Sequence, residues 1–433
     1  MHLGILTSHP IQYQAPWFRG LAEKVELDVI FAQRPDAAQQ GEGFGKSFNW
    51  DVDLLSGYRH RFLNNISPHP GSSHFAGCDT PEITDIIRRT SESGSPSAGS
   101  EATSRFDAFI VMGWYLKSYL QAMRACRAAG IPILVRGDSH LLTPRSLLKR
   151  LAMEMRQRWL LRQFDGFLCV GQRHREYLEH FGVPSGKIFP APHFVDNAWF
   201  AERAEIARKR RAEIRKKWRI PEEAFCILFC GKFIPQKRPL DVVEAVSLLL
   251  EPNSKFKIQN SKLPTVHLLF VGSGELGPQL RSKCNVAFDA ENAQQSVVSS
   301  SSSSGLRSAR PPASFAGFLN QTELPAAYVA ADVLVLPSES ETWGLSVNEA
   351  MACGLPAIVS DAVGCAPDLI DEGKTGSTFP GGCVYALAAC LSQTLNRYQD
   401  GYDFAARLSE KMSRYSLEKA VAGTLGAMKR LVN

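Results

Sequence analysis

The sequence predicts an α/β protein built from two Rossmann-like, doubly wound domains that face each other across a cleft. Its 433 residues are enough for two or three domains of ordinary size. Short, almost wholly apolar runs recur through both halves, a pattern typical of parallel strands buried on both faces. Helical patterns separate these runs, and repeated strand–helix units form parallel sheets. Ligands of such sheets bind beyond the carboxyl ends of the strands, so we expect the site there.

The first half, residues 1–205, is predicted to be one domain. A helical pattern covers Tyr115–Ala129, and a second, more basic one covers Arg145–Arg162. The predicted strands of this domain are Leu3–Thr7, Leu27–Phe31, Phe106–Val111, Ile131–Val135 and Gly166–Val170.

Residues 206–400 are predicted to form the second domain, and residues 401–433 to be helices that pack back toward the first. The charged stretch Glu202–Arg219 interrupts the alternation near the boundary and is interpreted as a solvated connecting helix. A further helix is expected at Leu240–Leu250. The predicted strands are Phe225–Cys230, Val266–Val271, Asp332–Pro337 and Pro356–Ser360.

Two segments, at about 90–105 and 285–313, are rich in Ser, Gly, Pro and Ala, and the second contains a run of serines. Such composition buries too little apolar surface to offset the entropy lost on ordering. We therefore expect disordered insertions there, one within each domain.

Composition narrows the function classes. The net charge of +6 is too small to imply bulk nucleic-acid binding. No apolar run is long enough to cross a membrane, and the first residues show no secretion signal, so we expect a cytoplasmic protein. The ten cysteines form no CxxC pair and the ten histidines show no ligand spacing, so no metal is expected.

The segment Asp332–Ser360 carries the densest chemistry. A buried strand, a polar loop, Gly344 and a helix follow one another, and a helix that starts at a glycine favours phosphate binding. Glu341 precedes the helix and Glu349 lies within it, where carboxylates suit the hydroxyls of a sugar or ribose. An acidic cap with a solvated helix glutamate is the alternative interpretation.

A second segment with candidate site residues, FCGKFIPQKRP, is basic and directly follows a predicted strand. Lys232, Lys237 and Arg238 would stand at the end of that strand, with Gly231 shaping the turn, and three cations suit a diphosphate. Taken alone, a solvated basic loop is the simpler interpretation. Gly272, and Gly317 with Phe318, follow two more strands and are weaker candidates for nucleotide contact.

The second half resembles the donor domain of retaining glycosyltransferases of family 4, the glycosyl transferases group 1, which have the GT-B fold. The matching pieces stand in the family's order over about residues 225–380. In the first half, TSHPIQYQAPWFRGL and LVRGDSH resemble a subgroup of the same family. The pieces of the second half are GKFIPQKRP, FVGSGEL, GFLNQTELPAAY and ETWGLSVNEAMACGLPAIVSDAVG, the last with the family's E-x7-E motif.

For the donor side, the resemblance implies that Lys237 binds the donor diphosphate, together with Lys232 where many members have arginine. Glu341 would face the donor sugar and Glu349 the ribose. The helix start whose amides contact the phosphates would be Gly344, Leu345 and Ser346.

For the acceptor side, the resemblance gives weaker candidates. Many members have a Gly-Gly loop after the first strand, and here that loop contains His9, Gln12 and Tyr13. The acceptor histidine of many members falls by spacing near Asp138, with His140 two residues on. Two further candidates are Arg136, within LVRGDSH, and Trp114, which could stack on an acceptor sugar or simply be buried.

Together these features predict a retaining, metal-independent glycosyltransferase that uses a nucleotide-diphosphate sugar and no further cofactor. The resemblance further implies a glycan or lipid-linked acceptor, in cell-surface polysaccharide or glycolipid biosynthesis. The basic amphipathic stretch Arg145–Arg162 could hold the protein peripherally on the inner face of the membrane, or be an ordinary packed helix. The rival functions are a sugar-nucleotide epimerase on the same fold and a non-catalytic, polyanion-binding scaffold.

Overall fold

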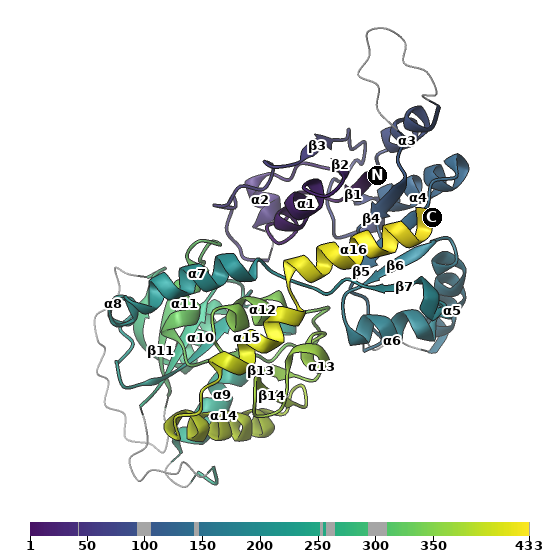
Figure 1. Cartoon of the computed structure of the whole chain (residues 1–433). Helices are drawn as coiled ribbons and strands as arrows, with labels where there is room; N and C mark the ends of the chain where they lie inside the picture. The colour runs from purple at the N-terminus through teal and green to yellow at the C-terminus, as the bar shows by residue number, and fades with distance from the viewer. Residues whose placement is uncertain are drawn as a thin grey trace. The chain divides into compact units, whose positions relative to one another are not determined.

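The computed structural model describes residues 1–41, 43–92, 105–142, 147–251, 254–256, 265–292 and 310–432. The chain forms two compact α/β units (Figure 1). The first unit is made of Met1–Gln40, Val52–Phe194 and Tyr415–Asn433, and the second of Gly41–Asp51 and Val195–Arg414.

The first unit contains a sheet of seven strands in the order β3-β2-β1-β4-β5-β6-β7, and every adjacent pair is parallel. Its strands are β1 His2–Thr7, β2 Glu26–Phe31, β3 Arg59–Phe62, β4 Ala108–Val111, β5 Ile133–Gly137, β6 Gly166–Cys169 and β7 Ile188–Pro190. Its α-helices are α1 Ala15–Ala22, α2 Ala37–Gln40, α3 Glu82–Glu92, α4 Lys117–Ala129, α5 Leu147–Leu161, α6 Gln172–His180 and α16 Leu417–Val432.

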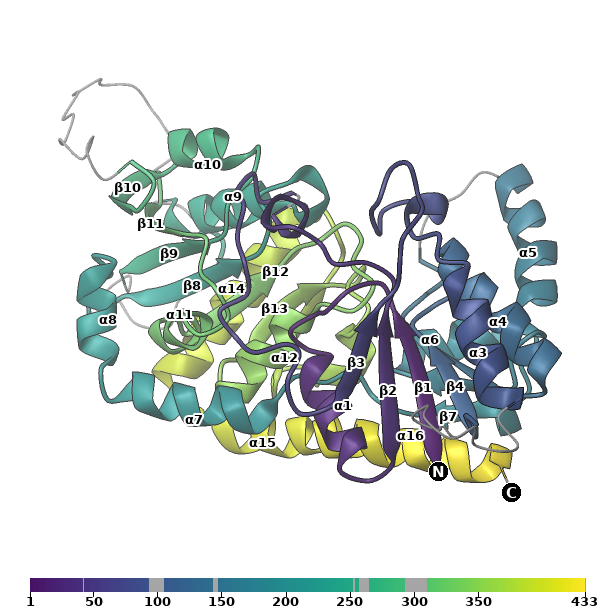
Figure 2. The same cartoon turned by 90° about the horizontal axis from the view of Figure 1, so that it is seen from above.

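Helices cover both faces of this sheet (Figure 2). Successive side chains of β1 point to opposite faces, so the strand contributes to a core on each side. Leu3 and Ile5 point into a core shared with Trp17 of α1 and Met428 of α16. Leu6 points to the opposite core, which α3 and α4 cover. Burial on both faces explains why Leu3, Ile5 and Leu6 of this strand are all apolar. The carboxyl ends of the strands are where a ligand site is expected.

The second unit repeats this design with seven parallel strands in the order β10-β11-β9-β8-β12-β13-β14. Its strands are β8 Phe225–Cys230, β9 Val266–Val271, β10 Asn285–Asp289, β11 Pro312–Gly317, β12 Val333–Leu336, β13 Ala357–Ser360 and β14 Gly376–Phe379. Its α-helices are α7 Asn197–Arg208, α8 Arg211–Lys217, α9 Pro239–Leu250, α10 Gly277–Lys283, α11 Leu324–Ala330, α12 Leu345–Ala352, α13 Ala366–Leu369, α14 Val384–Gln399 and α15 Ala405–Arg414.

The unit boundaries differ from those drawn on the sequence. The chain first passes from one unit to the other between Gln40 and Gly41. The boundary predicted at residue 205 lies between Phe194 and Val195. Of the last two helices, α15 belongs to the second unit and α16 to the first. Packing rather than composition decides these assignments, because α15 packs against α12 and α16 against α1 and β7.

The structure also corrects the bounds of the two predicted disordered insertions. Residues 285–289 form the edge strand β10, which pairs with β11, and β11 itself begins at Pro312. The first residues of the 90–105 segment continue α3 to Glu92. The rest of the two predictions, residues 93–104 and 293–309, lies outside the described residues.

The stretch Glu202–Arg219 is not one solvated connecting helix, because its second part is anchored in the core. Arg215 of α8 is 2% exposed and forms an ion pair of 2.7 Å with Asp332. It also donates to the carbonyl oxygen atoms of Ala330 and Ala224 at 2.9 and 3.0 Å. A buried guanidinium needs such partners, since an unpaired buried charge is strongly destabilising.

Among the helices of the described segments, none combines the length and the apolar character that a membrane span requires.

Candidate active site

The loops that follow β8 and β12 lie side by side in the second unit. The backbone N–H of Glu339 donates to the carbonyl oxygen of Gln236 at 2.8 Å, and the Gln236 side chain donates to the carbonyl oxygen of Ser340 at 3.0 Å. Beside these bonds, the Lys237 ammonium pairs with the Glu341 carboxylate. Two residues that were singled out from separate motifs therefore meet at one point.

Lys237 sits in an unusual electrostatic environment for a lysine. Burial and the neighbouring Lys232 ammonium lower the pKa of Lys237 to about 8, while the Glu341 carboxylate in contact with it favours the charged form. Two cations thus lie within electrostatic reach of each other. An anionic ligand such as a diphosphate would relieve their repulsion.

Gly344 stands where the loop turns into α12. Its φ of 102° lies in the left-handed region, and an added Cβ would come within 2.9 Å of Val363 and 3.1 Å of Leu336. Glu341 is tied to the same neighbourhood, because its carbonyl oxygen accepts from the backbone N–H of Gly364 at 3.0 Å. Only glycine fits here, and the amides of Leu345 and Ser346 follow at the start of the helix.

Glu349 lies on α12 in a much drier place than Glu341. Its side chain accepts a hydrogen bond of 2.6 Å from the Tyr328 hydroxyl, and the residue is 8% exposed. Burial raises the pKa of Glu349 to about 7, and the hydrogen bond from Tyr328 opposes that rise. Near neutral pH this carboxyl group can therefore accept a hydrogen bond from a hydroxyl group or donate one to it.

The glycines after β8, β9 and β11 bring three backbones close together. Gly272 has a φ of 128°, and an added Cβ would meet the carbonyl oxygen of Gly231 at 2.0 Å. The backbone N–H of Gly272 donates to the carbonyl oxygen of Gly317 at 2.8 Å. Gly272 is therefore needed for the close approach of the loops themselves.

Arg238 does not join the cluster through its Nε atom. That atom donates to Asp241 at 2.7 Å, an i, i+3 pair at the start of α9, and this hydrogen bond raises the pKa of Arg238. The arginine also has a φ of 49° where the chain turns into α9. The ion pair gives Arg238 a structural role at the helix start.

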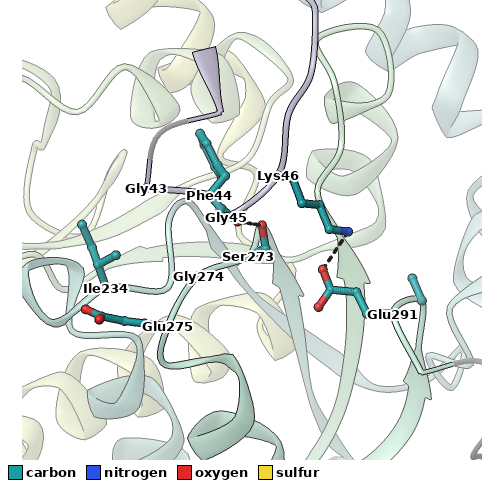
Figure 3. Close-up of a pocket in the computed structure, with 10 residues that line it drawn as sticks. Gly43, Phe44, Gly45, Lys46, Ile234, Ser273, Gly274, Glu275 and Glu291 are labelled. Carbon is teal, nitrogen blue, oxygen red and sulfur yellow. Dashed lines mark hydrogen bonds and ion pairs between the residues drawn. The ribbon is translucent and has the colours of Figure 1, made fainter. Parts of the chain in front are cut away.

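A cavity of about 980 Å³ opens beside these loops in the second unit (Figure 3). Its size suits a nucleotide-sized ligand. It is lined by Gly43, Phe44, Gly45, Lys46, Ile234, Ser273, Gly274, Glu275, Ala290 and Glu291.

In the first unit, three of the predicted acceptor residues line a smaller cavity of about 150 Å³. They are Tyr13, Arg136 and Asp138, and His193 joins them. His193 Nε2 lies 3.8 Å from Asp138, and the His193 ring packs edge-on against Tyr13. Burial lowers the pKa of His193, whereas Asp138 raises it.

Arg136 is held by backbone groups. It donates to the carbonyl oxygen atoms of Ala191 and Pro192 at 2.7 and 3.0 Å. Burial lowers the pKa of Arg136 to about 10. These bonds fix the guanidinium of this lining residue.

The other predicted acceptor residues do not line this cavity. His9 bonds to Ser8 at 2.9 Å, and burial lowers the pKa of His9 to about 4. Trp114 stacks on Tyr177, and His140 accepts from the backbone N–H of Leu142 at 3.2 Å. Gln12 is half-buried and also lies outside the lining.

Two family models match the chain. The model of glycosyl transferases group 1 matches residues 210–416, and that of the glycosyl transferase 4-like domain matches residues 49–192. The chain belongs to the group 1 glycosyltransferases. The resemblance drawn from the sequence motifs is thereby confirmed.

Curated relatives of this group 1 glycosyltransferase match only in part. A sulfoquinovosyl transferase of Arabidopsis thaliana is 53% identical over 87 residues, which cover 18% of this chain and 17% of the relative. A D-inositol 3-phosphate glycosyltransferase of Kineococcus radiotolerans is 27% identical over 266 residues, which cover 60% and 55% of the two chains. The chain thus spans about half the length, or less, of these relatives.

Solved structures share the fold over the whole chain. The Anabaena protein HepE, solved in complex with UDP and glucose, superposes with a TM-score of 0.61 at 13% identity and covers 99% of both chains. The α/β GT-B fold expected from the sequence is confirmed by this likeness and by the two parallel sheets.

Sequence reasoning missed Tyr328 and His193 as candidate site residues in this group 1 glycosyltransferase. Tyr328 ends the quoted motif GFLNQTELPAAY, but only the fold shows that it reaches Glu349 on another helix. His193 follows β7, a strand of three residues that is too short to predict from periodicity. A search for polar residues just beyond each strand would have found His193 had β7 been recognised.

Proposed function

We propose that this chain is a retaining glycosyltransferase that moves a hexose from a nucleotide-diphosphate sugar to a glycan or lipid-linked hydroxyl group. It would act without a metal ion or a further cofactor. The observation that carries the proposal is the meeting of Lys237 with Glu341 beside the glycine that starts α12.

The leaving diphosphate would be stabilised by groups of the second unit. As the bond between the anomeric carbon and the diphosphate oxygen lengthens, negative charge grows on the diphosphate. The ammonium groups of Lys232 and Lys237 and the first amides of α12 would stabilise that charge, in place of a metal. Glu341 would exchange its contact with Lys237 for hydroxyl groups of the sugar, and Glu349 would bind the ribose.

Retention requires the acceptor hydroxyl to attack the oxocarbenium-like centre on the face that the diphosphate leaves. The hydroxyl proton then passes to the departing diphosphate, which is the nearest strong acceptor on that face. The cavity of the first unit, with Tyr13, Arg136 and Asp138, is our candidate for contact with the acceptor.

UDP is the first donor nucleotide to test. HepE, which shares the fold at 14% identity, was also solved in complex with UDP-glucose. The cavity beside Ser273 and Glu291 is large enough for a nucleoside.

The helix α5 supports a place for the enzyme at a membrane surface, where it would assemble a polysaccharide or glycolipid from the cytoplasmic side. Met155 and Trp159 of this helix are 66% and 60% exposed, Arg156 is exposed on the same helix, and Arg162 is exposed just after its end. Exposed apolar and basic side chains on one helix favour an anionic lipid surface.

Co-sedimentation with vesicles that contain anionic lipid tests this membrane contact. The variant Trp159→Ser should lower the bound fraction severalfold, while Ile206→Ser, an exposed apolar change in the second unit, should leave it unchanged. Equal binding of both variants and the wild type would contradict the proposed role of α5.

Turnover of sugar nucleotides tests the proposed reaction. A panel of UDP-, GDP- and ADP-sugars is incubated with the full chain, and transfer or slow donor hydrolysis is measured. Glu341→Ala should lower the rate by at least about 100-fold because an electrostatic contact to the reacting sugar is lost. Glu339→Ala is the matched control, since Glu339 is an exposed carboxylate of the same loop.

Each rival function gives a different result in that assay. An epimerase would convert the sugar nucleotide into an epimer without any acceptor. A scaffold would show no turnover, would bind polyanions with a steep salt dependence, and would tolerate Glu341→Ala. Wild-type rates in Glu341→Ala would also reject our assignment of the site.

A further inference from the structure

Residues 41–51, here called the strap, lie in the second unit although the chain on either side belongs to the first. Its far end is anchored to the loop after β11. The Asp51 carboxylate accepts from the backbone N–H of Thr322 at 3.2 Å and from the Thr322 hydroxyl, and the Asn49 carbonyl oxygen accepts from the Asn320 side chain at 2.7 Å.

Aromatic rings hold the middle of the strap to a predicted donor residue. Phe48 packs on Phe318 with ring centroids 4.4 Å apart, and Phe44 meets the same ring edge-on at 5.1 Å. Such aromatic pairs stabilise the contact beyond the area they bury. The strap therefore rests on the loop that the sequence singled out as a nucleotide contact.

The strap also covers one side of Lys232. The Lys232 ammonium lies 5.1 Å from the centroid of the Phe44 ring, a cation–π contact. Gly43 permits this approach, because a Cβ added there would come within 2.8 Å of the Lys232 Nζ atom. Phe44 and Gly43 thus limit the directions in which this cation can point.

The same part of the strap forms a wall of the large cavity (Figure 3). The Ser273 hydroxyl donates to the carbonyl oxygen of Phe44 at 2.6 Å, and Lys46 pairs with Glu291 at 2.8 Å. Both contacts hold the strap at the edge of the cavity, which stays open at about 980 Å³ with the strap in place. The strap therefore lines the cavity and does not fill it.

We propose that the strap is part of the donor-binding pocket, with Phe44 as a positioning residue that aims Lys232 at the donor diphosphate. The base of the nucleotide would occupy the cavity, whose lining contains strap residues and Ser273–Glu275, and the diphosphate would lie toward Lys232, which contacts the lining residue Phe44. The inference rests on the proposed function, since it assumes a nucleoside diphosphate as the ligand.

Calorimetric titration of the full chain with UDP tests the role of the strap. Phe44→Ala should weaken UDP binding by about tenfold through lost alignment of Lys232. Phe44→Leu, which keeps most of the bulk, should give an intermediate value. Phe75→Ala, an exposed phenylalanine of the first unit, is the control and should bind as the wild type does.

A double-mutant cycle separates positioning from general damage to the fold. If Phe44 acts through Lys232, then Phe44→Ala should cost little further affinity in a Lys232→Ala background. Additive effects would overturn the positioning role. Unchanged UDP binding by Phe44→Ala would show that the strap does not contribute to the donor pocket. Tighter binding would show that the strap obstructs the pocket instead of lining it.

Failure of the proposed function would look different. If the wild type bound none of UDP, GDP and ADP, the proposed function and this inference would both be rejected. If the wild type bound one of them and Phe44→Ala bound it equally well, only the strap proposal would fall.

Discussion

Lys237 is the residue whose chemistry most shapes the proposed reaction. It is charged while protonated, and burial with the Lys232 ammonium lowers its pKa to about 8. Attraction to a diphosphate is therefore present in full below that pH and is lost as the pH rises through it. A bound diphosphate would hold the proton more tightly, as a nearby opposite charge does.

UDP affinity should accordingly depend on pH. From about pH 7 to about pH 9.5 the wild type should lose about tenfold in affinity, because Lys237 loses its proton. In Lys237→Arg the guanidinium stays charged, so its affinity should be nearly flat over that range. Titrations at several pH values measure both proteins, and an equal decline in the two would show that another group titrates.

The residues of the site were predictable to different degrees. Lys237 and Glu341 stand in motifs that the family resemblance picks out, and their meeting follows from the rule that parallel strands end at one edge of a sheet. The partnership of Tyr328 with Glu349 was not predictable, since it depends on how α11 packs beside α12. Arg238 and Asp241 stand three positions apart, a spacing that allows an ion pair, but the basic motif had grouped Arg238 with the lysines instead.

At the scale of elements, the start of α12 brings together the loop that carries Glu341 and the amides that we propose bind the diphosphate. Its first turn depends on Gly344, whose left-handed backbone and crowded neighbours exclude a side chain. Moving this glycine would shift both Glu341 and the helix start.

Gly344→Ala should therefore lower the free energy of unfolding by about 2 kcal/mol and weaken UDP binding as well. Gly426→Ala is the matched control, because Gly426 lies within α16 with no atom near the added Cβ. It should stabilise by up to about 1 kcal/mol. Denaturant unfolding and UDP titration of both variants are the measurements, and a neutral Gly344→Ala would contradict this account of α12.

Apolar strands were predictable and polar ones were not. All nine runs chosen for their apolar character lie on strands of the two sheets, because burial on both faces demands such residues. β3 has the sequence RHRF with mostly exposed side chains, and β7 has only three residues. The prediction placed the edge strand β10 inside a disordered insertion. A strand at the edge of a sheet buries little apolar surface, so its sequence lacks the apolar run that marks a central strand.

At the scale of the whole chain, the division into two α/β units was predictable from the alternation of strands and helices, but the path of the chain was not. No local pattern shows that residues 41–51 pack with the second unit, because Asp51 and its partner Thr322 are 271 positions apart. Long-range contacts of this kind are visible only in the folded structure.

The central claim is that cations of the second unit gather on one diphosphate. Calorimetric titration with UDP, comparing the wild type with Lys237→Ala, tests it most directly, and Lys283→Ala serves as control because Lys283 is an exposed lysine paired with Glu244 on the same unit. We predict that Lys237→Ala weakens binding by at least about tenfold and that Lys283→Ala does not. Full affinity in Lys237→Ala would contradict the account.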